Sequence, residues 1–225
     1  AIIDNREEID SKLIRETEKN NIKIYRGYTI TNTFGYRRIN KISIMQLSKD
    51  GQKVVDSKIN LSCDCLGISG GWTPAVHLFT QSGGKLKFRE EDQVFIPNTY
   101  PSDQLSIGAC NGDFTLDTIF SNVPKSLKNF LDIKDIEYEN AEVLSSFNKS
   151  KRNIWLLPSD KILGKTKSFV DYQNDATAKD IKLALREGFR SIEHVKRYTT
   201  TGMGTDQGKL GNMHALGIIA DTAGV

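Results

Sequence analysis

The sequence is poor in the residues that mark secreted, disulfide-stabilised or membrane proteins. It has three cysteines among 225 residues, and so few cysteines favour a reducing compartment. It has no run of about 18 apolar residues that could form a transmembrane helix. The charged opening AIIDNREEID lacks the apolar core of a signal peptide. We therefore expect a cytoplasmic protein without a membrane-spanning or membrane-bound part.

The charge balance is also mild. The formal net charge is +3, and 26% of the residues are charged, which is too little and too dispersed to predict a nucleic-acid partner. A chain of this length buries roughly 70% of its unfolded surface, so it needs no disulfides. It opens at Ala1 on an apolar triplet and stops at DTAGV, from which we expect a piece of a longer polypeptide.

Periodicity predicts an α/β chain followed by a helical region. Residues 1–3 and 22–25 favour strands, and Ile9, Leu13 and Ile14 between them have helical spacing, which together predict a βαβ unit of a parallel sheet. Residues 28–61 alternate between apolar and polar with turn signals at Gly35 and Asp50-Gly51, typical of an antiparallel meander. We expect further strands at 63–69 and 105–109, and helical segments starting at 113–123 and around 125–131.

The last third predicts a compact helical module. Thr177 and Asp180 have capping-box spacing, Ile181, Ala184 and Leu185 form an apolar face, and Gly188 stands where a helix should end. A second helix is expected from Ser191, with Ile192, Val195 and Tyr198 on one side. The run from Trp155 to Pro158 is an apolar patch ahead of the module.

A polar loop after that second helix is the main candidate site. A phosphate requires cations, hydroxyl donors and a closely approaching backbone, and residues 194–209 supply all three within HVKRYTTTGMGTDQGK. The alternative is a solvated polar turn. The candidate ligand-binding residues are Lys196, Arg197, Thr199, Thr200, Thr201, Gly202, Gly204, Gln207 and Lys209.

Asp4 is a second candidate, because an acidic residue after a strand of a dinucleotide-binding unit bonds the ribose. Its alternative role is a helix N-cap. Cys63 and Cys65 could share a metal ion, but no second pair exists, so we expect two buried small residues. His77, His194 and His214 have no metal-binding or catalytic spacing, and we predict no catalytic residue and no metal site.

Three segments, residues 63–86, 108–116 and 169–209, resemble the alpha subunit of heterotetrameric sarcosine oxidase. The resemblance implies that residues 1–123 are the C-terminal part of an NAD-binding domain with an antiparallel β insert, similar to two-dinucleotide-binding flavoproteins. Residues 124–165 would be a connector, and 166–225 a small helical domain leading to a folate-binding domain.

By the same resemblance, the complex of alpha, beta, gamma and delta subunits oxidises sarcosine to glycine. It passes the one-carbon unit to tetrahydrofolate and forms hydrogen peroxide. FMN lies at the interface of alpha with beta, NAD in the full alpha subunit, and FAD and tetrahydrofolate elsewhere. The 194–209 loop would face the FMN, and the isolated chain would be inactive. A related proline-type dehydrogenase complex and a non-catalytic docking module are the alternatives.

The helical module also resembles the small [2Fe–2S] domain of bacterioferritin-associated ferredoxin. The positions of that family's four cysteines are occupied here by Asp171, Gln173, Asp206 and Gly211. None of these is a thiolate, so we predict that this scaffold holds no such cluster.

Overall fold

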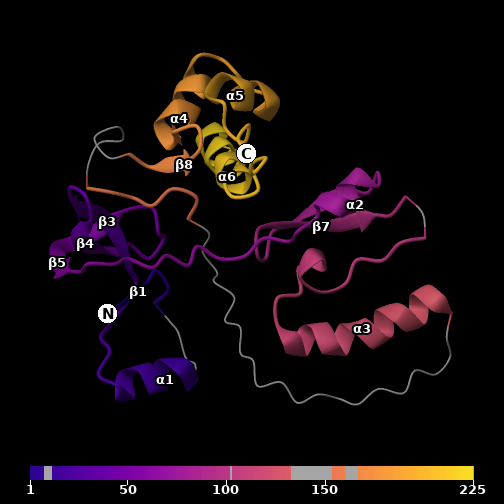
Figure 1. Cartoon of the computed structure of the whole chain (residues 1–225), viewed down its shortest axis with the longest axis horizontal. Helices are drawn as coiled ribbons and strands as arrows, with labels where there is room; N and C mark the ends of the chain where they lie inside the picture. Colours follow the sequence, from indigo (N-terminus) through magenta and orange to yellow (C-terminus); the bar gives the residue numbers. More distant parts are fainter. Residues whose placement is uncertain (8–11, 102, 133–153, 161–166, 225) are drawn as a thin grey trace. The chain divides into compact units, whose positions relative to one another are not determined.

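The computed structural model describes residues 1–7, 12–101, 103–132, 154–160 and 167–224. It is a mixed α/β structure with small sheets and a C-terminal helical region (Figure 1). Two compact units are present. One contains Ala1–Glu8, Arg15–Leu66 and Ile154–Val225, and the other contains Ile9–Ile14 and Gly67–Asn153.

The N-terminal residues form the expected strand–helix–strand unit. Strand β1 (Ile2–Asp4), helix α1 (Lys12–Lys19) and strand β2 (Ile24–Arg26) follow in order, and β1 pairs in parallel with β2. The prediction of a parallel pair is therefore confirmed. Of the apolar positions expected in the helix, Ile9 lies outside the described residues and Leu13 is exposed.

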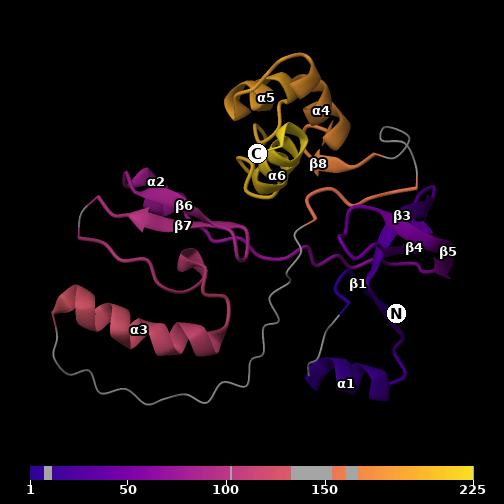
Figure 2. The same cartoon turned by 180° about the vertical axis from the view of Figure 1, so that it is seen from behind.

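The alternating segment forms an antiparallel sheet, as predicted. Its strands β3 (Tyr28–Gly35), β4 (Ile39–Leu47) and β5 (Val54–Ser62) lie in the order β3-β4-β5 (Figure 2). The side chains of Ile42 and Ile44 on the central strand form a buried cluster with Tyr25. Full burial of an isoleucine such as Ile44 contributes about 1.5–3 kcal/mol to folding.

Two predicted strands are absent from the structure. At residues 63–69 the chain leaves the sheet after the Cys63 N–H bonds the Asn40 carbonyl, and no strand follows there. Residues 105–109 run into the 3-10 helix η1 (Gly108–Asn111). Gly108 has a φ of 77°, which ends an extended run.

The second unit combines a small hairpin with helices. Helix α2 (His77–Gln81) precedes strands β6 (Lys85–Arg89) and β7 (Val94–Thr99), which pair antiparallel. Helix α3 (Leu116–Leu131) joins the two helical segments predicted separately and continues through Pro124. Proline removes one N–H donor from a helix but need not end it.

The C-terminal module contains the three helices that position the candidate loop. Its elements are β8 (Phe169–Asp171), β9 (Ala176–Thr177), α4 (Ala178–Arg186), α5 (Ile192–Thr199) and α6 (Asn212–Ala223). The capping box is present, with the Thr177 and Asp180 side chains each accepting from the other's backbone N–H. Gly188 follows the C-cap of α4 with a φ of 97°, so both helix-end predictions are confirmed.

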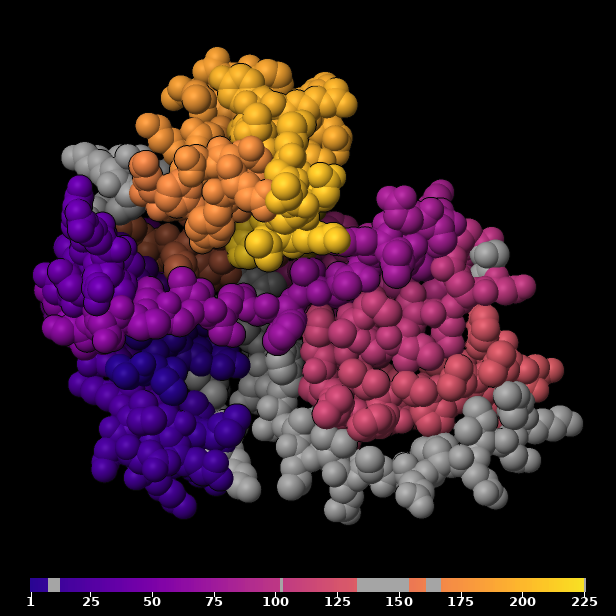
Figure 3. All heavy atoms as spheres, in the orientation of Figure 1, coloured from indigo at the N-terminus to yellow at the C-terminus, as the bar shows by residue number. Residues whose placement is uncertain are grey.

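The three helices pack around one small core, and Figure 3 shows the outer surface of this module in orange and yellow. Ile181 and Ala184 are fully buried there, as their spacing predicts. On α5 only Val195 reaches the core, because Ile192 and Tyr198 are exposed. Trp155, which begins the predicted apolar patch, packs against the same core.

Candidate functional site

The candidate loop runs from the end of α5 to the start of α6. Helix α5 ends at a C-cap, Thr200, whose φ of 58° is left-handed. Gly202, Gln207 and Gly208 also have positive φ values, so the loop turns sharply several times. Left-handed backbone favours glycine, which accounts for part of the glycine content of this segment.

The three consecutive threonines use their hydroxyl groups within the protein. The Thr199 hydroxyl donates to the Val195 carbonyl at 2.8 Å, and the Thr200 hydroxyl donates to the Thr199 carbonyl at 2.6 Å. The hydroxyls of Thr199 and Thr201 lie 2.8 Å apart. A hydroxyl has one proton, so Thr201 donates in that pair. Binding a phosphate through these protons requires these bonds to rearrange.

The glycines make room for side chains of the module itself. A Cβ added at Gly202 would lie 2.2 Å from Asn212 Oδ1, and one at Gly204 would lie 2.3 Å from Gln173 Oε1. A Cβ at Gly211 would lie 2.4 Å from the Val170 carbonyl oxygen. At Gly211 the neighbour is backbone and leaves no room for a Cβ, whereas at Gly202 and Gly204 a side chain of the module would have to shift.

Side chains of the β8–β9 turn hold the loop by hydrogen bonds. Asp171 Oδ2 accepts from the Gly202 N–H at 2.7 Å. Gln173 Oε1 accepts from the N–H and hydroxyl of Thr205 at 2.6 and 2.8 Å. Asn174 Nδ2 donates to the Thr200 carbonyl at 3.1 Å. Sequence reasoning did not propose these three anchoring residues as part of the site.

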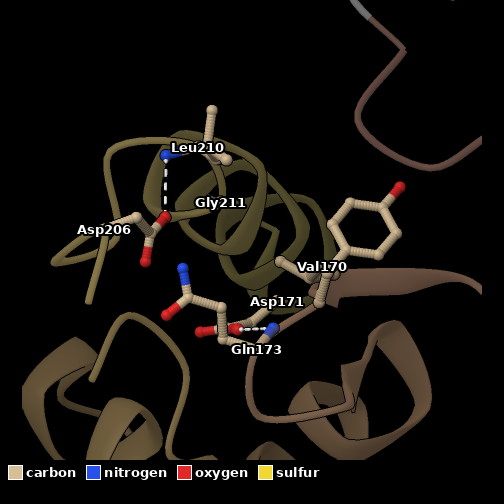
Figure 4. Close-up of a pocket in the computed structure, with 7 residues that line it drawn as sticks. Val170, Asp171, Gln173, Asp206, Leu210 and Gly211 are labelled. Carbon is tan, nitrogen blue, oxygen red and sulfur yellow. Dashed lines mark hydrogen bonds between the residues drawn. The ribbon is translucent and has the colours of Figure 1, made fainter. Parts of the chain in front are cut away.

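The four positions aligned with the ferredoxin cysteines come together in space. They line one small pocket with Val170, Tyr172 and Leu210 (Figure 4). The Asp206 carboxylate accepts from the backbone N–H groups of Gly208 and Leu210, each at 3.3 Å. Among the described residues no group of three or more histidine, cysteine, aspartate or glutamate side chains could hold a metal ion.

Asp171 is a buried carboxylate with only 7% of its surface exposed. Burial alone would raise the pKa of its carboxyl, but the backbone N–H donors of Asn174, Gly202 and Gln173 outweigh burial and lower it. Hydrogen bonds to the charged form act in this direction. The group is therefore a carboxylate at neutral pH.

Three cations lie in the loop or in the helical turn before it. Lys196 and Arg197 lie in the last turn of α5, where a positive charge is favoured by the helix dipole, and Lys209 lies in the exposed second half of the loop. Within the described ranges none of the three forms an ion pair. Gln207 Nε2 donates to the Gly204 carbonyl at 3.1 Å. The cations are thus the groups of the predicted site that keep their charge available to an anion.

Asp4, the second candidate, lies at the end of β1 and is paired with Arg6. Arg6 donates to its carboxylate through Nε at 3.0 Å, through Nη2 at 2.7 Å and through its backbone N–H at 2.9 Å. Burial opposes ionisation, but these hydrogen bonds prevail and lower the pKa of Asp4. Since residues 5–7 directly after it are not helical, Asp4 does not cap a helix.

The remaining candidates are cysteines and histidines. Cys65 is exposed and Cys63 half-buried, so the expectation of two buried small residues is wrong. The reason is the missing strand at 63–69. His77, His194 and His214 are exposed, and the His214 ring meets Trp155 edge-on at 6.2 Å.

Comparison with known proteins identifies the family. Residues 165–225 match the family model of the sarcosine oxidase A3 domain. The sarcosine oxidase subunit alpha of Corynebacterium sp. (strain U-96) is 28% identical over 230 residues, covering 100% of this chain. That of Rhizobium meliloti (strain 1021) is 34% identical over 176 residues, covering 73% of this chain. The chain is a homologue of the sarcosine oxidase alpha subunit. The resemblance found in the sequence is therefore confirmed.

The homology to the sarcosine oxidase alpha subunit covers only part of that subunit. The chain spans 24% of the Corynebacterium protein and 17% of the Rhizobium protein. Among solved structures, L-proline dehydrogenase from P. horikoshii is similar in fold, with a TM-score of 0.52 and 15% identity, covering 100% of this chain and 44% of that one. No helix among the described residues has the length and apolar character to cross a membrane.

Proposed function

We propose that the chain is part of the alpha subunit of a sarcosine oxidase complex. Homology along the whole chain, including the A3 domain, is the observation that carries this proposal. The complex demethylates sarcosine oxidatively to glycine, transfers the one-carbon unit to tetrahydrofolate and forms hydrogen peroxide. Its other members are the beta, gamma and delta subunits. The chemistry takes place on flavins outside this chain, so we assign no catalytic residue to it.

Within this complex, the 196–209 loop binds the phosphate of FMN at the interface with the beta subunit. The residues present fit such a group, because Lys196, Arg197 and Lys209 carry positive charge without ion-pair partners in the described part of the chain. The FMN supplies redox chemistry, and the loop supplies charge and orientation. The threonine hydroxyls and the Gly202 N–H act within the protein, so the cations carry most of the interaction.

The N-terminal unit belongs, in this proposal, to the NAD-binding domain of the full subunit. Asp4 fits a ribose only in part. Oδ1 accepts two hydrogen bonds from Arg6 and Oδ2 accepts one, and a carboxylate oxygen accepts about two. Oδ2 therefore retains room for one ribose hydroxyl. The division into residues 1–123, 124–165 and 166–225 and the cluster-less ferredoxin-like character of the last part belong to the same proposal.

The experiment replaces Lys196 and Arg197 together by alanine in the assembled complex. A charge-assisted contact contributes about 1.5–3 kcal/mol when it is shielded from water, so losing two should weaken phosphate binding at least about tenfold. We expect a lower ratio of FMN to FAD, measured after denaturing release and peptide mapping, with FAD content unchanged.

The matched control removes two positive charges from the same module away from the loop, as Lys182→Ala with Arg186→Ala on α4. We expect this variant to keep the normal FMN to FAD ratio. If the loop variant also keeps the normal ratio and turns over normally, the loop is a polar turn and does not hold the flavin.

A further inference from the structure

The β8–β9 turn and the candidate loop are joined by side chains rather than by a sheet. Asp171 bonds the Gly202 N–H at 2.7 Å, and Gln173 bonds Thr205 through two donors at 2.6 and 2.8 Å. These contacts join positions 31 and 32 residues apart in the sequence. Both anchored N–H groups are in the loop, so the two side chains fix the orientation of its peptide planes.

The Asp171 side chain is itself held in place by hydrogen bonds to both of its carboxylate oxygens. Its Oδ1 accepts from the backbone N–H groups of Gln173 and Asn174 at 2.8 and 3.0 Å. Its Oδ2 accepts from Asn174 Nδ2 at 3.4 Å in addition to Gly202. The carboxylate thus meets N–H donors on both oxygens, and an amide at this position would direct its NH2 group at one of them.

Two backbone N–H groups beside the residues held by Asp171 and Gln173 remain available to a ligand. Gly204 lies between the two anchored residues, and Asp206 follows the second one. Neither of their backbone N–H groups bonds an acceptor within the described part of the chain. Gly204 also packs directly on the Gln173 side chain. The position of these free N–H groups therefore depends on the β8–β9 turn.

A carboxylate near a phosphate site has two opposite effects. Its charge repels the phosphate, so removing the charge alone would strengthen phosphate binding. Its hydrogen bonds hold the loop, so removing them would weaken binding by letting the loop move. When the carboxylate is replaced, the first effect predicts stronger phosphate binding and the second predicts weaker binding. A measurement of binding therefore tests the role of Asp171 directly.

We propose that Asp171 is a positioning residue for the phosphate-binding loop, assisted by Gln173. It fixes the Gly202–Thr205 backbone so that the neighbouring free N–H groups and the cations of the loop converge on one anion. The inference rests on the proposed FMN-binding function of the loop. Asp171 itself does not touch the phosphate.

The test uses Asp171→Asn in the assembled complex, with Asp180→Asn as the matched control. Asp180 is a half-buried acid of the same module that accepts N–H bonds in the capping box, but it does not contact the loop. We measure amide hydrogen exchange at residues 202–206 and the FMN to FAD ratio. Loss of one buried hydrogen bond speeds exchange by about tenfold.

For Asp171→Asn we expect faster exchange in the loop and a lower FMN to FAD ratio. For Asp180→Asn we expect lower thermal stability with both loop readouts close to wild type. If the complex does not assemble with Asp171→Asn, Gln173→Met is used. It removes the Thr205 acceptor from an exposed position without changing charge, and we expect the same two changes, smaller in size.

The possible failures are distinguishable. An unchanged or raised FMN ratio in Asp171→Asn, together with a lowered ratio in the Lys196 and Arg197 double variant, contradicts the positioning role alone. An unchanged ratio in both variants contradicts the FMN-binding function itself. If Asp180→Asn lowers the FMN to FAD ratio as much as Asp171→Asn does, general destabilisation explains the result. This outcome also contradicts the positioning role.

Discussion

At the scale of single residues, Gly204 was expected to lie against a ligand, but in the structure it packs against a side chain of the protein itself. The sequence GMGTDQGK suggests backbone placed close to a phosphate. In the structure the space a Cβ would take at Gly204 belongs to Gln173, and the space at Gly202 belongs to Asn212. These close contacts account for glycine at these positions without a phosphate nearby.

Asp180 carries a prediction on pH dependence. Its hydrogen bond with the Thr177 side chain lowers its pKa below the ordinary value, against the opposing effect of burial. A folded-state pKa below the unfolded one adds stability above the unfolded value, and this stability is lost as the pH falls through the folded value. We expect the unfolding temperature of the chain to fall as the pH is lowered past about 4.

The Asp180→Asn variant isolates this contribution. We expect it to be less stable than wild type at pH 7 by about 0.3–1 kcal/mol, the usual contribution of a negative charge in the first turn of a helix. The difference from wild type should shrink below about pH 4, as measured by denaturant unfolding across the pH range. A difference that stays constant with pH would show that the carboxylate charge contributes nothing there.

At the scale of elements, helix α6 depends on a glycine in its middle. A Cβ added at Gly217 would lie 2.1 Å from Cδ2 of Trp155, and the Trp155 ring packs on the core of the module. We expect Gly217→Ala to destabilise the chain by about 1–3 kcal/mol, the usual cost of overpacking, despite the better helix propensity of alanine. Urea unfolding measures this difference.

Two further variants separate the clash from a general effect on the helix. Asp221→Ala changes an exposed position of α6 and should leave stability within about 0.5 kcal/mol of wild type. Trp155→Ala combined with Gly217→Ala should cost less than the sum of the two single changes, because the clash is already removed. If the cost of the double variant equals the sum of the two single costs, the Cβ at position 217 does not clash with the Trp155 ring.

Local signals at helix ends made these elements predictable. The spacing of Thr177, Asp180 and Gly188 gave α4 its start and end, because capping depends on neighbouring residues alone. The strand expected at 63–69 was wrong, because a strand needs a partner and apolar composition does not supply one. The buried hydrogen bond between Asp171 and the Gly202 N–H was not predictable, since it joins residues 31 apart. The resemblance to the ferredoxin family aligned Asp171 with a cysteine of that family, which does not indicate the partners of an aspartate.

At the scale of the whole molecule, the chain matches only part of the length of its relatives. It covers 24% of the Corynebacterium sarcosine oxidase alpha subunit, and its candidate site offers cations and anchored backbone but no reacting group that we assign. In the function proposed above, such a site would orient FMN without reacting itself. The activity therefore has to be measured on the assembled complex.

The most direct test of this account is substrate oxidation by the assembled complex containing this chain within its full subunit. Hydrogen peroxide formation is measured with sarcosine and with proline, each with and without tetrahydrofolate. We expect peroxide and glycine from sarcosine, capture of the one-carbon unit when tetrahydrofolate is present, and little turnover of proline. Oxidation of proline in preference to sarcosine, or no amine oxidation by a complex that retains its flavins, would contradict the account.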